Sequence, residues 1–91
     1  MEIVNNTDQD ARVRVAGGSG MDRPDRSVEK EDPSRWPLLR SGDKLAHKPS
    51  PPGPWTVHFV INGCRIVQKI FLENSKVKLS GAGASFEAKV E

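Results

Sequence analysis

The feature that most limits the fold of this chain is a two-residue turn signal between two apolar runs. The runs are residues 55–61 (WTVHFVI) and 64–70 (CRIVQKI). Asn62-Gly63 lies between them and suits a type I′ turn, because both central residues of that turn need positive φ angles. The pattern predicts an antiparallel hairpin in which Ile61 lies opposite Cys64, with one largely apolar face and one mixed face.

Apolar residues alternate with polar ones in most other patterned parts of the chain, which is typical of half-buried strands. The predicted strands are residues 2–5, 11–16, 37–40, 44–48, 55–61, 64–72, 76–80 and 85–91. No window shows the spacing of an amphipathic helix. Seven or eight short strands without a helix predict an all-β fold, a small antiparallel β-sandwich, with a small barrel as the second choice.

Residues 17–36 interrupt the strand pattern with glycine, proline and mixed charges, and they have almost no large apolar side chains. We expect this segment to be a long, flexible and disordered loop inserted in the sandwich, because long loops without structure are usually functional or disordered. The 91 residues of the chain are enough for one domain only. We therefore expect a single sandwich domain over residues 1–91.

The single cysteine, Cys64, excludes an intrachain disulfide. A small secreted domain usually carries several disulfides, so this count favours a reducing, cytoplasmic location. The N-terminal residues lack the pattern of a signal peptide. No apolar run is long enough to span a bilayer, and we expect no membrane span.

Charge is distributed unevenly along the chain. Residues 1–32 carry eight acidic and five basic residues, whereas residues 33–91 carry four acidic and nine basic ones. A candidate cationic surface is formed by basic residues at outward positions of the predicted strands: Arg12, Arg14, Arg65, Lys69, Lys76, Lys78 and Lys89. If these side chains share one sheet, they would suit the phosphate backbone of a nucleic acid. The alternative is that they solvate the outer faces and prevent pairing at the sheet edges.

Aromatic side chains for base stacking are few. By phase, Trp55, Phe59 and Phe86 face the core, which leaves Trp36 and Phe71 as the free aromatic residues. The proline-rich stretch before Trp55 contains PxxP patterns, so Pro49, Pro51 and Pro52 are candidates for a protein-binding loop in the polyproline II conformation. The alternative is a stiff turn that delivers Trp55 into the sandwich.

Catalytic and metal-binding patterns are weak. His47, His58 and Cys64 are the soft ligands of the chain, and the hairpin register puts His58 and Cys64 on opposite faces. We interpret His58 as a surface residue and Cys64 as a small apolar residue beside the turn. We predict no catalytic residue, metal or cofactor, and therefore no enzyme.

The number and spacing of the strands resemble immunoglobulin-like sandwiches in shape, without the paired cysteines of those domains. We expect a non-enzymatic binding or assembly module whose loops carry the function, with a protein partner or self-association. The alternative is nucleic-acid binding through the outward residues Arg12, Arg14, Lys69, Lys76 and Lys78.

Overall fold

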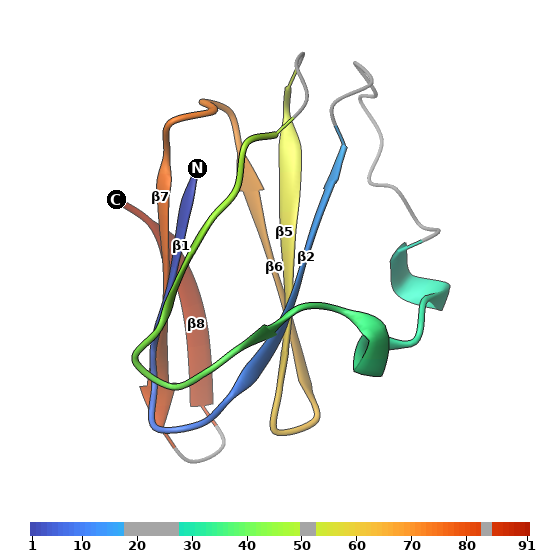
Figure 1. The fold of residues 1–91 in the computed structure, drawn as a ribbon, viewed down its shortest axis with the longest axis vertical. Coiled ribbons are helices and arrows are strands. Elements are labelled where there is room, and N and C mark those ends of the chain that lie inside the picture. The colour runs from blue at the N-terminus through green and yellow to red at the C-terminus, as the bar shows by residue number, and fades with distance from the viewer. Residues whose placement is uncertain (18–27, 50–52, 83–84) are drawn as a thin grey trace.

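The computed structural model describes residues 1–17, 28–49, 53–82 and 85–91. Two four-stranded sheets lie side by side as the layers of a β-sandwich (Figure 1). The elements are β1 (Glu2–Asn6), β2 (Ala11–Gly17), the 3₁₀ turns η1 (Val28–Lys30) and η2 (Pro33–Arg35), β3 (Leu38–Leu39), β4 (Lys44–Ala46), β5 (Trp55–Ile61), β6 (Cys64–Ile70), β7 (Lys76–Ala82) and β8 (Ser85–Val90). The predicted all-β sandwich is confirmed, and the two sheets do not close into a barrel.

The first layer, here called the terminal sheet, has the strand order β4-β1-β7-β8. In this sheet β1 pairs in parallel with β7 and antiparallel with β4, and β7 pairs antiparallel with β8. The second layer, here called the hairpin sheet, has the order β3-β2-β5-β6 with antiparallel pairs throughout. The chain therefore crosses from one layer to the other several times, and its first and last strands lie in the same sheet.

The predicted hairpin is confirmed residue by residue. Ile61 pairs with Cys64 and Trp55 with Ile70, and the pairs between them follow the predicted register. Asn62 and Gly63 have φ angles of 49° and 76°, as the type I′ turn requires.

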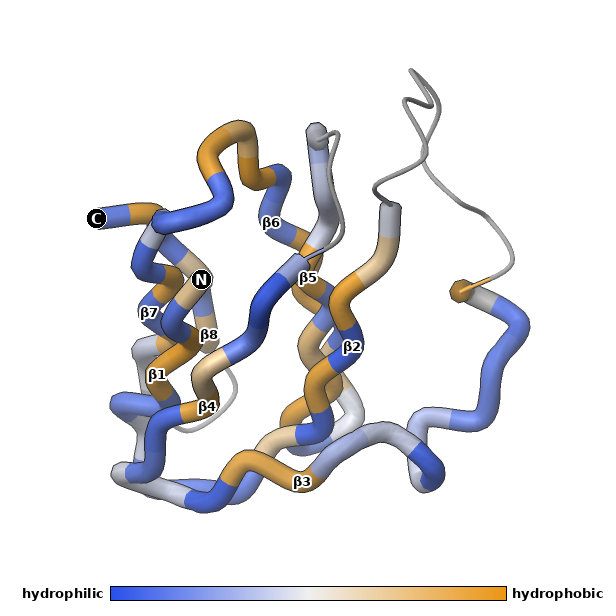
Figure 2. The backbone as a smooth tube through the Cα atoms, turned by 45° about the horizontal axis from the view of Figure 1, so that its top comes forward, coloured by the Kyte–Doolittle hydropathy of each residue, from blue (hydrophilic) through white to orange (hydrophobic). Residues whose placement is uncertain are grey.

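The core lies between the two sheets and consists of the residues that alternation places inward. Figure 2 shows hydrophobic and hydrophilic residues alternating along several strands of both sheets. The fully or almost fully buried members are Ile3, Ala11, Val13, Leu39, Trp55, Val57, Phe59, Ile61, Ile70, Val77 and Leu79. Val90 lies opposite the buried Val77 on the inward face, yet it is 43% exposed because it ends β8 at the edge of the terminal sheet.

The end of β1 and the loop that follows it contain a buried polar cluster. Asn5 is fully buried, and its side-chain amide donates hydrogen bonds to the carbonyl oxygens of Gln9 (2.8 Å) and Leu39 (2.9 Å). Its Oδ1 accepts from the backbone N–H of Thr7 (3.1 Å) and from the Thr7 hydroxyl (2.6 Å). Since Leu39 belongs to the hairpin sheet and Asn5 to the terminal sheet, this one side chain links the two layers.

Residues 28–36 differ from the expected disordered loop. They form η1 and η2 and lie against the hairpin sheet on the side away from the terminal sheet (Figure 1). Val28 and Trp36 are buried there with Ala16, so these apolar side chains cover part of the sheet. The rest of the predicted loop, residues 18–27, lies outside the described residues.

Candidate functional site

The outer face of the hairpin sheet, which is the face turned away from the terminal sheet, gathers most of the candidate residues. Three rows of cross-strand neighbours on β2, β5 and β6 make up this face: Ala16–Thr56–Lys69, Arg14–His58–Val67 and Arg12–Val60–Arg65. The register of the hairpin and the pairing of β2 with β5 together bring four cations onto one surface.

Trp36 lies over this face, where the covering segment 28–37 holds it. The segment is shaped by η2, in which the side chain of Asp32 accepts a hydrogen bond from the backbone N–H of Ser34 (3.0 Å). The turn ends where the N–H of Trp36 donates to the carbonyl of Pro33 (3.0 Å). One residue after Trp36, the carbonyl oxygen of Pro37 accepts a hydrogen bond from the backbone N–H of Val13 in β2. Trp36 is thus tied to the sheet by the backbone that follows it.

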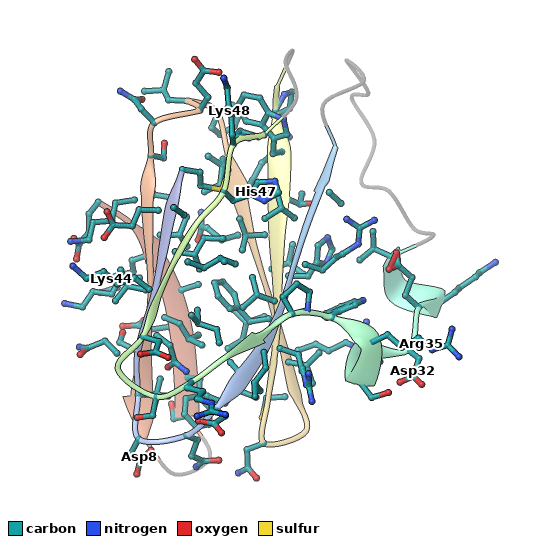
Figure 3. All side chains as sticks on the ribbon, in the orientation of Figure 1. Asp8, Asp32, Arg35, Lys44, His47 and Lys48 are labelled. Atoms are coloured by element: carbon teal, nitrogen blue, oxygen red, sulfur yellow. The ribbon has the colours of Figure 1, made fainter. Side chains whose placement is uncertain are left out.

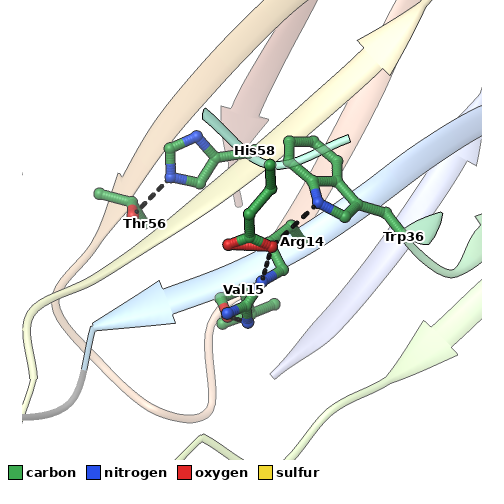
Figure 4. Close-up of polar contacts among 6 residues, drawn as sticks. Arg14, Val15, Trp36, Thr56 and His58 are labelled. Atoms are coloured by element: carbon green, nitrogen blue, oxygen red, sulfur yellow. Dashed lines mark hydrogen bonds and ion pairs between the residues drawn. The ribbon is translucent and has the colours of Figure 1, made fainter. Parts of the chain in front are cut away.

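Polar contacts fix the indole ring and its backbone (Figure 4). The indole N–H donates to Glu31 Oε1 (3.3 Å), and the same carboxylate oxygen accepts from Arg14 Nε (3.2 Å). Arg12 donates from Nη1 to the carbonyl oxygen of Trp36 (3.1 Å). The edge of the ring meets the His58 ring at a centroid distance of 6.3 Å. Charged and aromatic side chains thus surround the buried indole of Trp36.

Two sequence-based interpretations are wrong at this cluster. Trp36 was expected to be a free aromatic residue, but it is only 4% exposed. His58 was interpreted as a surface residue, but it is 7% exposed and its Nε2 lies 2.9 Å from the hydroxyl of Thr56. The physical reason is the covering segment, which converts part of an outer sheet face into an interior. Phe71 is exposed, with 70% of its surface accessible to solvent.

A groove of about 390 Å³, here called the Trp36 groove, runs between the covering segment and β6. Its lining consists of Trp36, His58, Phe59, Arg65, Ile66 and Val67. The guanidinium carbon of Arg65 lies 5.7 Å from the centre of the Trp36 ring, within the range of a cation–π contact. Val67 is 56% exposed beside it. The groove therefore combines an aromatic wall, an apolar rim and a positive charge.

A second cavity, of about 460 Å³, also borders Trp36 and is lined by Arg14, Glu31, Asp32, Arg35, Trp36 and Pro37. Asp32 and Arg35 lie on the outer side of η2, away from the sheets (Figure 3). The pKa of Asp32 is lowered, because the backbone N–H and then the hydroxyl of Ser34 hydrogen-bond to its carboxylate, with a smaller contribution from the charge of Arg35. Opposite charges lie close together in this cavity, so it is less selective for a charged ligand than the groove.

The four cations of the outer face differ in their partners. Arg14 forms an ion pair with Glu31, and Arg12 is engaged by the Trp36 carbonyl. Arg65 contacts the Trp36 ring, and the amine of Lys69 lies 5.5 Å from the centre of the Phe71 ring. In the described part of the chain, no carboxylate lies within 4.0 Å of Arg65 or Lys69. Arg12 also lacks a carboxylate partner among these residues, but the Trp36 carbonyl oxygen accepts a hydrogen bond from its guanidinium. Arg65 and Lys69 are therefore the exposed cations of the face whose charged groups have only aromatic neighbours in the described part of the chain.

The other predicted basic residues lie in the terminal sheet. Lys76 and Lys78 of β7 reach Glu91 at 3.8 and 3.7 Å, and Lys89 of β8 reaches Glu87 at 3.3 Å. The predicted cationic set is thus divided: Arg12, Arg14, Arg65 and Lys69 come together, whereas Lys76, Lys78 and Lys89 belong to the other layer and have acidic neighbours.

The predicted proline loop is described only in part. Pro49 is buried, so its ring is not available to a partner. Pro51 and Pro52 lie outside the described residues. Gly53 and Pro54 lead directly into β5, and Trp55 is buried in the core as the stiff-turn interpretation expects.

The remaining chemical candidates stay apart. The register puts His58 on the outer face and Cys64, at the start of β6, on the opposite face, as predicted. Within the described ranges, no group of three His, Cys, Asp or Glu side chains is arranged to hold a metal ion. The same ranges contain no helix with the length and apolarity needed to cross a bilayer.

Sequence reasoning missed the association of Trp36 with Glu31, Arg14 and His58. The only local signal was a large aromatic side chain at the end of a polar stretch. Comparison with protein families, characterised proteins and solved structures finds no significant match to this chain.

Proposed function

We propose that this chain is a non-enzymatic binding module whose partner occupies the Trp36 groove and the neighbouring strand β6. The observation that carries the proposal is the pair of cations, Arg65 and Lys69, with no carboxylate neighbour among the described residues, on either side of the exposed Val67. A surface with an aromatic wall, apolar rim and flanking charge has the composition of a protein-binding site.

The two cations also define what kind of partner suits the site. They attract an anionic partner, and the cation–π contact holds the Arg65 head over the indole. Arg12, Arg14 and Glu31 hold Trp36 in place, so the groove is formed before a partner arrives. A preformed site loses less side-chain entropy on binding than a flexible one.

A peptide-display selection on the immobilised chain tests this proposal. Selected peptides should bind the wild type and lose at least about tenfold in affinity when Arg65→Gln and Val67→Ser are combined, as residues central to an interface do. The matched control combines Lys76→Gln and Lys78→Gln, which removes charge from the other sheet and should leave affinity unchanged. No enrichment, or equal affinity for the groove variant and the control, would refute the proposal.

Nucleic-acid binding is the second candidate, and the gathering of Arg12, Arg14, Arg65 and Lys69 on one face favours it. Its support is smaller, because Arg12 already donates to the Trp36 carbonyl and Arg14 already forms an ion pair with Glu31. Binding of a single-stranded oligonucleotide through these residues should weaken with salt, with a log–log slope of about −0.7 per phosphate contacted. Absence of any chemical-shift change at low salt would remove this candidate.

Two broader expectations belong to the same proposal. We propose a reducing, cytoplasmic setting, for which the single Cys64 is the support. The likeness to immunoglobulin-like sandwiches is proposed for shape alone, and it carries no function.

A further inference from the structure

The edge of the hairpin sheet at β6 offers a place for an added strand. In the described part of the chain β6 pairs with β5 on one side and forms no ladder with a strand on the other, where β8 of the terminal sheet packs near it without pairing. It is seven residues long, whereas the strand at the opposite edge of this sheet, β3, has two. Long open edges present unpaired backbone donors and acceptors that another chain can use.

The hairpin register shows which backbone groups face the open edge. In a hairpin with a two-residue turn, the residues that flank the turn, Ile61 and Cys64, form a hydrogen-bonded pair. Bonded and non-bonded pairs then alternate along an antiparallel ladder. The N–H and C=O groups of Arg65, Val67 and Lys69 therefore point away from β5. One of them, the Lys69 carbonyl, also accepts from the Gln68 side-chain amide at 3.2 Å.

The same three residues place their side chains on the outer face, where all are exposed. The order is positive, apolar, positive at alternate positions. The long edge of the terminal sheet differs, because Glu87 and Lys89 of β8 pair with each other at 3.3 Å. Of these two long edges, β6 alone combines outward backbone groups with uncompensated charge of one sign.

We propose that β6 binds an extended acidic segment of a protein partner as an added antiparallel strand, with acidic, apolar and acidic side chains at alternate positions opposite Lys69, Val67 and Arg65. This inference rests on the binding function proposed above and names its mode and ligand class. Backbone hydrogen bonds supply affinity in strand addition, and alternate side chains supply specificity. The apolar residue would lie beside Val67 at the rim of the Trp36 groove.

Charge argues against a second copy of this chain as the occupant. In the symmetric antiparallel register centred on Val67, Arg65 of each copy would face Lys69 of the other. Like charges directly opposite one another destabilise a pair of strands. The side chains that disfavour self-pairing are thus the ones that select an acidic strand.

The test uses a capped nine-residue peptide, here called the alternating peptide, with glutamate at positions 3 and 7, valine at position 5 and threonine elsewhere, so that the glutamates and the valine share one face of an extended strand. It is titrated into the ¹⁵N-labelled chain. We expect saturable binding and slower hydrogen exchange at the amides of Arg65, Val67 and Lys69. The combined variant Arg65→Gln, Lys69→Gln should weaken binding about five- to tenfold, from the loss of two cross-strand charge pairs. The control Lys76→Gln, Lys78→Gln should bind like the wild type.

Three altered peptides separate the contributions of spacing, backbone pairing and charge. A peptide of the same composition with the glutamates and the valine at consecutive positions keeps the charge but divides the three side chains between the two faces of the strand, and it should bind more weakly. A version of the alternating peptide with N-methyl groups on alternate residues removes the pairing N–H groups and should lose binding. A version of the alternating peptide with lysine in place of both glutamates should bind the Arg65→Glu, Lys69→Glu variant and not the wild type.

Three outcomes would overturn the inference. Binding that is unaffected by N-methylation, or that leaves the three amides unprotected, would reject strand addition while the groove remains a binding site. No binding of the alternating peptide would reject the acidic ligand class, and the display selection would still decide the binding function. Sedimentation that shows dimers formed through β6 would replace the acidic partner with a second copy.

Discussion

At the scale of single residues, Asn5 shows how one buried polar side chain can join two layers. The sequence around it, Asn5-Asn6-Thr7, has the form of a glycosylation acceptor. In the fold its amide is buried and fully engaged with Gln9, Leu39 and Thr7, so this side chain is structural.

We expect Asn5→Ala to lower the free energy of unfolding by about 2–3 kcal/mol, because it leaves buried backbone groups without partners. Urea denaturation followed by tryptophan fluorescence measures the change. The neighbouring exposed Asn6 provides the matched control, and Asn6→Ala should stay within about 0.5 kcal/mol of the wild type. Equal effects of the two substitutions would show that Asn5 does not link the sheets.

The carboxyl group of Asp32 should titrate below the ordinary pKa of an aspartate, which is about 3.9. Hydrogen bonds from Ser34 lower the pKa of Asp32 in the folded chain. The contribution of this cap to stability is therefore present at pH values above the pKa of the unfolded chain, and it is lost as the pH falls through the pKa of the folded chain. The Ser34 amide shift in NMR spectra should therefore titrate with a midpoint below about 3.9. Asp32→Asn should abolish the titration, and a midpoint above 4 would contradict the assigned cause.

At the scale of elements, two glycines in hairpin connections have different roles. Gly63 needs its positive φ for the turn, but a Cβ there would meet nothing within 4 Å. Gly81 in β7 has φ of 130°, and a Cβ there would come within 2.2 Å of the Ser85 carbonyl oxygen. The first position requires backbone freedom only, whereas the second also requires space.

We expect Gly63→Ala to cost about 1 kcal/mol of stability, which is the strain of a left-handed residue. Gly81→Ala should cost at least about 2 kcal/mol more, because the backbone of β7 and β8 must separate. Thermal unfolding of both variants under identical conditions measures the difference. Similar melting temperatures would mean that the close approach of β8 to Gly81 is absent in solution.

The covering segment is the element that the sequence described least well. Its glycine- and proline-bounded stretch predicts a disordered loop, yet residues 28–36 bury Val28 and Trp36 on the hairpin sheet. A few apolar side chains far apart in a polar segment carry no periodic signal, because periodicity needs a regular element. Burial of His58 follows from the same packing and was missed for the same reason.

At the scale of the whole molecule, the arrangement of charge controls how the edges of the sandwich meet other molecules. The hairpin sheet ends in the basic edge β6, whereas the acidic and basic groups of β7 and β8 compensate one another. Edge strands commonly use charged side chains to prevent pairing between copies.

We expect the chain to sediment as a monomer at micromolar concentrations. Replacing the edge charges, Arg65→Val with Lys69→Val, should cause concentration-dependent association, because it leaves a long apolar edge. The control Lys76→Val with Lys78→Val adds the same apolar groups to β7, an interior strand, and should associate much less. A wild type that dimerises would show that the charges of β6 do not prevent association, and a control that associates equally would show that β6 is not the edge that matters.

The hairpin, its register and most strand positions followed from the sequence alone. Alternation and the Asn62-Gly63 turn act over a few neighbouring residues, so their physics is contained in the local sequence. The tertiary structure decided which strands share a sheet, including the parallel pairing of β1 with β7. It also divided the basic residues between two layers. These features depend on contacts between residues far apart in the chain, such as the Asn5–Leu39 hydrogen bond, and no local pattern encodes them.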